Sequence, residues 1–304
     1  MLLLACACTG GKYETFSGYA QGGTYRVKVN MQGVRVSPET VAAAIDSLLE
    51  AIDFSISGYN RNSLLSKRNA GEEIVPDRYF SELLELSEKY KELSGGAFDV
   101  YSGPLFDLWG FGFTSDSLPS DEAIERALAD CKAGKILNFN AIAQGYSCDI
   151  VAEYLYSIGV KDMLVDIGEI FCDGRNPSGK GWSIGVDNPV DGNDSPGSDL
   201  RGIWRSNGAA QGIVTSGNYR KFYVKDGKKY AHTIDPRSGR PVEHGLLSAS
   251  VVAPTAAEAD ALATACMVLG PQGARELVEA LDGVEAYLIF ADGVWTSKGF
   301  NLEQ

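Results

Sequence analysis

Histidine is scarce in this chain of 304 residues, which contains only His232 and His244. Its six cysteines form no C-x-x-C pair, so the usual ligand clusters of a zinc site are missing, and a disulfide framework is not expected at this length. Lysine and arginine form no run, and the formal net charge is −13, so nucleic acid is not expected as a partner. An anionic ligand would need local compensation from a metal ion, backbone amides or a helix N-terminus.

No segment approaches the ~20 consecutive apolar residues of a membrane-spanning helix. The first residues, MLLLACACTGG, place Leu-Leu-Ala before Cys6, as at the end of a lipoprotein signal, but few residues precede Cys6. Either a longer signal lies upstream or the apolar start is a coincidence. The polar, glycine-rich sequence from Thr9 onward resembles a tether and favours the lipoprotein. We therefore expect a signal remnant and tether over residues 1–11, a lipid anchor on Cys6, and a location in the cell envelope facing the periplasm.

Residues 12–304 combine strands and helices without strict alternation, which predicts one α+β domain with mixed, mainly antiparallel sheets flanked by helices. Periodicity and capping residues predict helices over residues 38–52, 76–93, 120–131, 141–159, 255–266 and 271–281. Alternating or β-branched stretches predict strands over residues 23–30, 135–140, 161–174, 181–189, 212–224 and 246–254. An acidic surface loop is expected over residues 190–202.

One predicted helix carries oxygen atoms among apolar residues. Residues 255–266 read TAAEADALATAC, and Asp260 and Thr264 lie four residues apart, on one face. Thr255 and Glu258 form a capping box, so the helix dipole favours the charge of Asp260 without any ligand. A mid-helix threonine also commonly bonds the carbonyl one turn back. From the residues alone, a structural or surface role and a functional role are equally supported.

A second candidate segment, YAHTIDPRSGRP, follows a predicted hairpin. Asp235 stands in turn-forming sequence and is expected to hold the turn. His232 is the side chain best suited to move protons near neutral pH, although spacing alone does not make it catalytic. A third segment, NFNAIAQGYSCD, joins a predicted strand to a helix. The free backbone groups of such a junction can bind a ligand or merely connect the two elements.

These segments resemble, in order and across nearly the whole chain, the ApbE-like flavin transferase family, which moves FMN from FAD onto a threonine or serine of a target protein. SGYNRNSLLSKRN is similar to the family's S-x-Y-x-x-x-S-x-x-x-x-x-N segment, and GAFDVYSGPLFDLWGFG to its G-x-F-D…P-L…W-G-F block. NFNAIAQGYSCD resembles D-L-x-x-I-A-K-G-Y-x-x-D, TSGNYRKFY…HTIDPRSGRP resembles T-S-G-x-Y…H-I-I-D-P-x-T-G-x-P, and ADALATA resembles A-D-A-L-A-T-A. The resemblance implies an ApbE-like domain and an FAD:protein FMN transferase that requires Mg²⁺.

The resemblance also implies the ligands of the metal ion. In the family, Mg²⁺ is bound by the aspartate and threonine of the A-D-A-L-A-T helix, by a carbonyl between them, and by a carbonyl of the strand-to-helix junction. Here these ligands are Asp260, Thr264, Ala263 and Ala141. All four provide hard oxygen atoms, as Mg²⁺ requires. The metal ion would hold the pyrophosphate of FAD and would compensate its charge on an acidic protein.

The other residues carried over from the family contact FAD or move a proton. Tyr59 would stack on the flavin nucleotide, and His232 would accept the proton of the acceptor hydroxyl. The remaining expected FAD contacts are Ala97, Phe98, Asp99, Asn138, Gln144 and Ile234.

Some residues depart from the family pattern. Asn138 stands where an aspartate is usual, and Gln144 where a lysine or glutamate is usual. Gly22 replaces the methionine of an M-G-T element. Gly168 is one glycine where the family commonly has two, and a shortened turn there would shift the strand register by one residue unless the loop absorbs it.

Two alternatives to flavin transfer remain open. The first is hydrolysis of FAD to FMN and AMP; within the family, loss of the aromatic residue at the Tyr59 position goes with this reaction, so Tyr59 favours transfer. The second is a non-catalytic flavin-binding lipoprotein. The family's acceptor motif, D-x-x-S/T-G-A-S/T, does not occur in this chain. A transferase would therefore act on a partner flavoprotein subunit that carries the motif.

Overall fold

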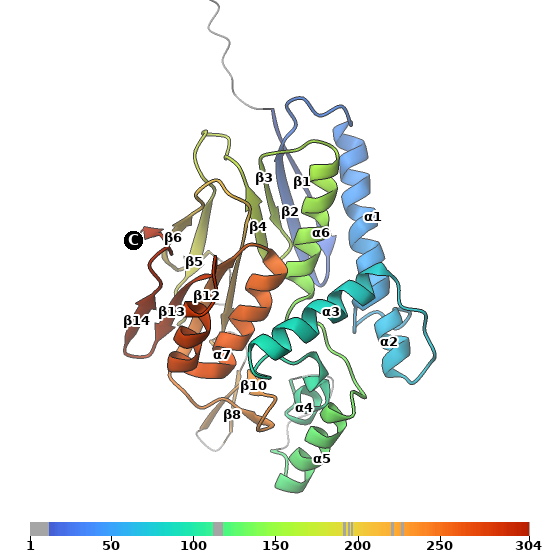
Figure 1. Cartoon of the computed structure of the whole chain (residues 1–304), viewed down its shortest axis with the longest axis vertical. Coiled ribbons are helices and arrows are strands. Elements are labelled where there is room, and N and C mark those ends of the chain that lie inside the picture. Colours follow the sequence, from blue (N-terminus) through green and yellow to red (C-terminus); the bar gives the residue numbers. More distant parts are fainter. Residues whose placement is uncertain are drawn as a thin grey trace, which may run out of the picture.

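The computed structural model describes residues 12–111, 118–190, 193, 195, 197–219, 222–225 and 228–303. Its largest element is an eight-stranded sheet with the strand order β1-β2-β3-β4-β7-β12-β13-β14 (Figure 1). These strands are β1 (Tyr13–Ala20), β2 (Gly23–Asn30), β3 (Met163–Asp166), β4 (Ile170–Asp173), β7 (Gln211–Gly217), β12 (Leu246–Ala253), β13 (Glu285–Phe290) and β14 (Gly293–Thr296). All neighbouring strands run antiparallel. The predicted α+β fold with mainly antiparallel sheets is confirmed.

The remaining strands form smaller sheets. A three-stranded sheet has the order β15-β6-β5, and two further pairs are β8 with β9 and β10 with β11. The strands are β5 (Ser183–Asp187), β6 (Leu200–Arg205), β8 (Phe222–Lys225), β9 (Lys228–Ala231), β10 (Ile234–Asp235), β11 (Arg240–Pro241) and β15 (Leu302–Glu303). Because β6 begins at Leu200, the acidic loop expected over residues 190–202 ends earlier than predicted.

Of the helices, α1, α6 and α7 pack on one face of the large sheet, and the three-stranded sheet covers the other face (Figure 1). The helices are α1 (Pro38–Ile56), α2 (Leu64–Asn69), α3 (Arg78–Leu93), η1 (Val100–Ser102), α4 (Gly103–Leu108), α5 (Asp121–Lys132), α6 (Ala143–Ser157) and α7 (Ala256–Glu279). In β12, Val251 packs with residues of α7, whereas the next residue, Val252, packs with Trp182 and Trp204 beside the small sheet. Successive side chains of β12 therefore point to opposite faces of the sheet, as expected for a strand that is buried on both faces.

Helix α7 joins the two helices predicted over residues 255–266 and 271–281. It is kinked at Gly270, whose φ of 74° is not helical, and Pro271 follows inside the helix. The first half begins against β7, where a Cβ on Gly212 would lie only 2.4 Å from Ala256 Cα. Only glycine permits this close approach of backbones. None of the helices among the described residues combines the length and the apolar character needed to cross a bilayer.

The strand expected over residues 135–140 is wrong. Its backbone groups bond outside any ladder: Leu137 N donates to Asn69 Oδ1 at 2.9 Å, and Asn69 Nδ2 donates to the Leu137 carbonyl at 2.8 Å. A side-chain amide thus replaces the neighbouring strand. Strand β1 was not predicted, and among its side chains only Phe16 is buried. The predicted signal remnant and tether at residues 1–11 lie outside the described residues.

Candidate active site

A cleft with a volume of about 500 Å³ lies beside the first half of α7. It collects side chains from segments that are far apart in the sequence. The predicted site residues that line it are Tyr59, Ala97, Phe98, Asp99, Asn138, Ala141, Gln144, His232, Ile234, Asp260 and Thr264. Ala263 is fully buried and is not among the lining residues. The fold therefore brings together all the predicted residues except this one, whose predicted contribution is a carbonyl.

Asp260 is buried, with 5% of its surface exposed, which excludes the surface role that the sequence left open. Its Oδ2 accepts a hydrogen bond from Gly145 N at 3.1 Å, and within the described part of the chain this is its one hydrogen bond. Burial raises the pKa of Asp260, and the nearby carboxylate of Asp149 raises it further. A buried carboxylate with so little compensation is costly when ionised unless a cation pairs with it.

The atoms around Asp260 suit a hard cation. Thr264 lies one helical turn further along α7 and lines the cleft, as does Ala141 just before α6. The described residues provide no hydrogen-bond partner for the Thr264 hydroxyl, so the bond to the preceding turn is not formed. Those same residues contain no cluster of three His, Cys, Asp or Glu side chains that could hold a metal. One carboxylate with hydroxyl and carbonyl oxygens fits Mg²⁺ better than zinc.

Asp149 was not singled out from the sequence, yet it contacts the start of α7. Its Oδ1 and Oδ2 accept hydrogen bonds from Ala256 N and Ala257 N, both at 2.8 Å. Burial raises the pKa of Asp149 to about 7 despite these two bonds. Carboxylates are favoured at such positions because the first amides of a helix have no partner within the helix.

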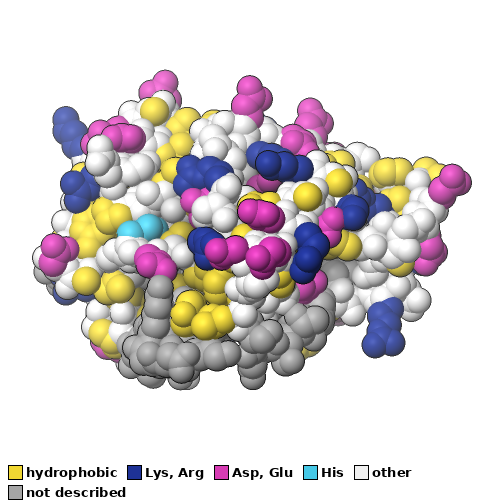
Figure 2. All heavy atoms as spheres, turned by 90° about the horizontal axis from the view of Figure 1, so that it is seen from below, with side chains coloured by type: hydrophobic (Ala, Val, Ile, Leu, Met, Phe, Trp, Pro, Cys, Tyr) yellow, Lys and Arg dark blue, Asp and Glu magenta, His cyan; other side chains and the backbone are white. Residues whose placement is uncertain are grey.

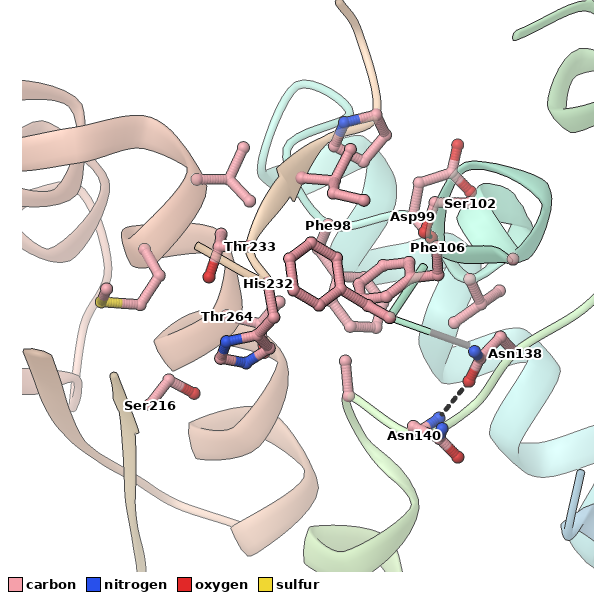
Figure 3. Close-up of a pocket in the computed structure, with 18 of the residues that line it drawn as sticks. Phe98, Asp99, Ser102, Phe106, Asn138, Asn140, Ser216, His232, Thr233 and Thr264 are labelled. Carbon is pink, nitrogen blue, oxygen red and sulfur yellow. Dashed lines mark hydrogen bonds between the residues drawn. The ribbon is translucent and has the colours of Figure 1, made fainter. Parts of the chain in front are cut away.

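The segment after α3 forms one wall of the cleft. Ala97 and Phe98 are each 1% exposed, and Asp99 caps η1 by accepting a hydrogen bond from Tyr101 N at 2.9 Å. Lys91 Nζ lies 3.0 Å from Asp99 Oδ2. This segment therefore forms a rigid surface of the pocket. Figure 3 shows Asp99 on the side of the view away from His232 and Thr264.

Asn140 connects Tyr59, which is expected to stack on the flavin, to the segment that precedes α6. Asn140 Nδ2 donates to Tyr59 Oη at 3.2 Å, and Asn140 N donates to Asn138 Oδ1 at 2.9 Å (Figure 3). The Tyr59 side chain is 71% exposed at the rim of the cleft. Asn140 lay within a motif used for the resemblance, but no role was assigned to it. Its contacts show that it orients both neighbours.

The single glycine at 168 does not disturb the sheet. Val165 pairs with Phe171 and both lie in the core beneath the helices, so the turn absorbs the shorter sequence. Gly168 has a φ of 94°, and a Cβ there would lie 2.6 Å from Gln144 Nε2. The positive φ favours glycine, whereas a shift of the flexible Gln144 side chain would relieve the Cβ contact. The turn thus packs directly on Gln144, and Glu169, which the sequence did not suggest, also lines the cleft.

His232 follows β9 and is half-buried. Its ring meets that of Phe111 edge-on, with centroids 6.3 Å apart. In Figure 3 it lies on the side of the cleft that carries Ser216 and Thr264. Asp235 accepts a hydrogen bond from Arg237 N at 2.8 Å and pairs with its guanidinium, so it holds the turn as expected.

A second cavity, of about 560 Å³, adjoins the cleft. Tyr59, Asn140 and Gln144 line both cavities, while Gln21 and Asp53 line only the second. The combined space extends from α7 to the turn between β1 and β2. A long ligand can therefore extend past Tyr59 from one cavity into the other.

Comparison with known proteins identifies this architecture. A family model described as "ApbE family" matches residues 22–288. The chain belongs to the ApbE family. The FAD:protein FMN transferase of Escherichia coli (strain K12) is 32% identical over 285 residues, which cover 84% of this chain and 79% of that protein. The protein of the same name from Vibrio cholerae is 32% identical over 302 residues, which cover 92% and 88%.

Solved ApbE structures share the whole fold. The flavin transferase ApbE from Vibrio cholerae superposes with a TM-score of 0.81 at 29% identity, covering 95% of this chain and 98% of that one. The apo form of Pseudomonas stutzeri flavinyl transferase ApbE gives a TM-score of 0.83 at 32% identity, covering 95% of each chain. The family predicted from the five sequence segments is confirmed.

Proposed function

We propose that this chain is an FAD:protein FMN transferase that uses Mg²⁺. The observation that carries this proposal is the buried, poorly compensated carboxylate of Asp260 in a cleft that gathers nearly all the predicted site residues. The names of the family members at 32% identity support the same reaction.

The proposed cation ligands are Asp260, Thr264 and the carbonyls of Ala141 and Ala263. When bound, Mg²⁺ neutralises charge on the pyrophosphate and stabilises AMP as the leaving group. The face of the protein in Figure 2 carries Lys and Arg side chains interspersed with Asp and Glu, and no continuous basic surface covers it. Because the formal net charge is −13, attraction of a polyanion has to come from the site itself.

The chain's own residues position the nucleotide and move the proton. The two cavities hold FAD, with Tyr59 stacked on the flavin nucleotide and Phe98 and Asp99 along the wall. His232 accepts the proton of the acceptor hydroxyl as its oxygen bonds to the phosphorus of the FMN half. The bond from this phosphorus to the AMP oxygen breaks, and AMP leaves with the electron pair.

The competing reaction is hydrolysis, in which water replaces the acceptor. Incubation with FAD and Mg²⁺, with and without a peptide that carries D-x-x-S/T-G-A-S/T, separates the two. We expect peptide flavinylation and slow AMP release without peptide, while fast release without peptide would refute transfer. Asp260→Ala should abolish turnover and Asp282→Asn, an exposed carboxylate change, should not. Unchanged FAD conversion by Asp260→Ala would refute the proposed cation site.

The acceptor is proposed to be a flavoprotein subunit of the cell envelope, and the enzyme to be anchored there by a lipid on Cys6, facing the periplasm. Intact-mass analysis of membrane-fraction protein tests the anchor, with Cys6→Ala and its neighbour Cys8→Ala as a matched pair. We expect a lipid adduct on wild type and Cys8→Ala only. An adduct that survives Cys6→Ala, or no adduct at all, contradicts the anchor.

A further inference from the structure

Reciprocal carboxylate contacts join the N-termini of α6 and α7. Asp149 on α6 accepts hydrogen bonds from Ala256 N and Ala257 N on α7, both at 2.8 Å. Asp260 on α7 accepts one from Gly145 N on α6 at 3.1 Å. In each helix the carboxylate lies four residues after a donor, so donor and acceptor share the face that meets the other helix.

The two helices touch through their main chains at this point. A Cβ on Gly145 would lie 2.3 Å from the Ala256 carbonyl oxygen and 2.9 Å from Ala257 N. No side chain can act as a spacer there, so the position of the first turn of α7 depends on the bonds from Asp149. Any shift of this turn carries Asp260, one turn further along, with it.

We propose that Asp149 is a positioning residue for the cation site. It holds the first turn of α7 so that the Asp260 carboxylate stays at a fixed distance from the Ala141 carbonyl, two residues before the start of α6. The inference rests on the proposed function, because it takes Asp260 and Ala141 as ligands. Asp149 lines neither of the two cavities described above, so it acts through the helix rather than by contact with substrate.

A matched control is available on the same helical turn. The Thr255 hydroxyl is the N-cap of α7 and accepts a hydrogen bond from Glu258 N at 3.2 Å. Its loss is expected to destabilise by ~1 kcal/mol, as for other N-caps, without removing the link to α6. Asp149→Asn keeps the side-chain shape but offers one acceptor oxygen to two amides and places an NH₂ group against an N–H.

The test is Mn²⁺ binding, measured by electron paramagnetic resonance, together with thermal unfolding and activity as a function of Mg²⁺. We expect Asp149→Asn to weaken Mn²⁺ binding by ~10–100-fold, as for other residues that orient metal ligands. The Mn²⁺ affinity of Thr255→Ala should stay within about twofold of wild type, because the bonds from Asp149 still hold the metal ligands on α6 and α7 at their distance. At saturating Mg²⁺, the turnover number of Asp149→Asn should recover while the Mg²⁺ concentration for half-maximal activity stays raised.

Three outcomes decide the inference. Wild-type Mn²⁺ affinity in Asp149→Asn overturns the inference. An equal loss of Mn²⁺ affinity in Thr255→Ala also overturns it, because affinity would then depend on helix stability alone. Asp260→Ala should abolish Mn²⁺ binding. If it does not, the proposed cation site itself fails, which separates that failure from failure of the role of Asp149. Should Asp149→Asn not fold, Asp149→Ser, which keeps one uncharged acceptor, takes its place with the same expected results.

Discussion

Replacing Asp260 with asparagine is expected to stabilise the metal-free protein above neutral pH. The carboxylate is buried, and it accepts one hydrogen bond from the described residues, that of Gly145 N. Burial raises its pKa from an ordinary value of 3.8 to about 7. The folded state therefore binds this proton more tightly than the unfolded state, and ionisation costs folding free energy. Asparagine keeps an acceptor oxygen for Gly145 N and carries no charge.

The size of the effect follows from the pKa values. At ~1.4 kcal/mol per pH unit, the rise sets an upper bound of ~4 kcal/mol on the gain. Because Asp149 competes for the same proton, we expect a gain of ~2 kcal/mol, which corresponds to ~3 °C in Tm for a chain of this size. The folded-state pKa is the raised one, so the gain is absent below about pH 4, grows through the interval up to about pH 7 and is complete above it.

Thermal unfolding in a chelator, at about pH 5 and about pH 8, measures this difference. Mg²⁺ should raise the Tm of wild type and leave that of Asp260→Asn unchanged, because ligand binding stabilises only a fold that has the site. The exposed change Asp282→Asn should stay within ~0.5 kcal/mol of wild type at both pH values. A lower Tm for Asp260→Asn at the higher pH in chelator would refute the reasoning.

Three further predictions concern neighbouring features. Gly145→Ala should lower the free energy of unfolding by ~1–3 kcal/mol in urea titrations, because the added Cβ meets the Ala256 carbonyl. An unchanged urea midpoint would contradict this prediction. Burial lowers the pKa of His244, so the free energy of unfolding should fall as the pH drops below the ordinary histidine pKa of 6.5. His244→Gln should reduce this loss between about pH 7.5 and about pH 5.5. Parallel stability profiles of wild type and variant over this interval would contradict the prediction. His232→Asn should slow flavin transfer by at least ~100-fold in stopped assays. FAD affinity, measured by equilibrium binding, should stay within about tenfold of wild type. Near-normal turnover would show that His232 does not accept the proton.

The sequence was sufficient for the family, the fold class and most of the cleft because these depend on local segments. Asp260 and Thr264 share a helix face by spacing alone, and capping residues mark the start of that helix. The resemblance then predicted that distant segments meet there, and the structure places Ala141 and Asp260 in one cleft.

Features that depend on contacts between distant segments could not be predicted in this way. Asp149 is the last residue of the segment NFNAIAQGYSCD, but its role becomes visible only in its bonds to amides more than a hundred residues away. The strand expected over residues 135–140 failed for a related reason: its alternating pattern is correct for an extended backbone, but Asn69 takes the place of a ladder partner. Nothing local in the sequence reveals which group will satisfy an extended backbone.

Three main chains meet at Ala256, where Gly145 of α6 and Gly212 of β7 approach α7 without intervening side chains. Such a contact has no rotamers to exchange, so it fixes the start of α7, the helix from which Asp260 and Thr264 line the cleft. Ligands of different size must then be accommodated away from α7, at the part of the cleft built from short helices around Phe106. Inhibitor chemistry aimed at this cleft should therefore hold constant the groups that face Asp260 and vary those that face Phe106.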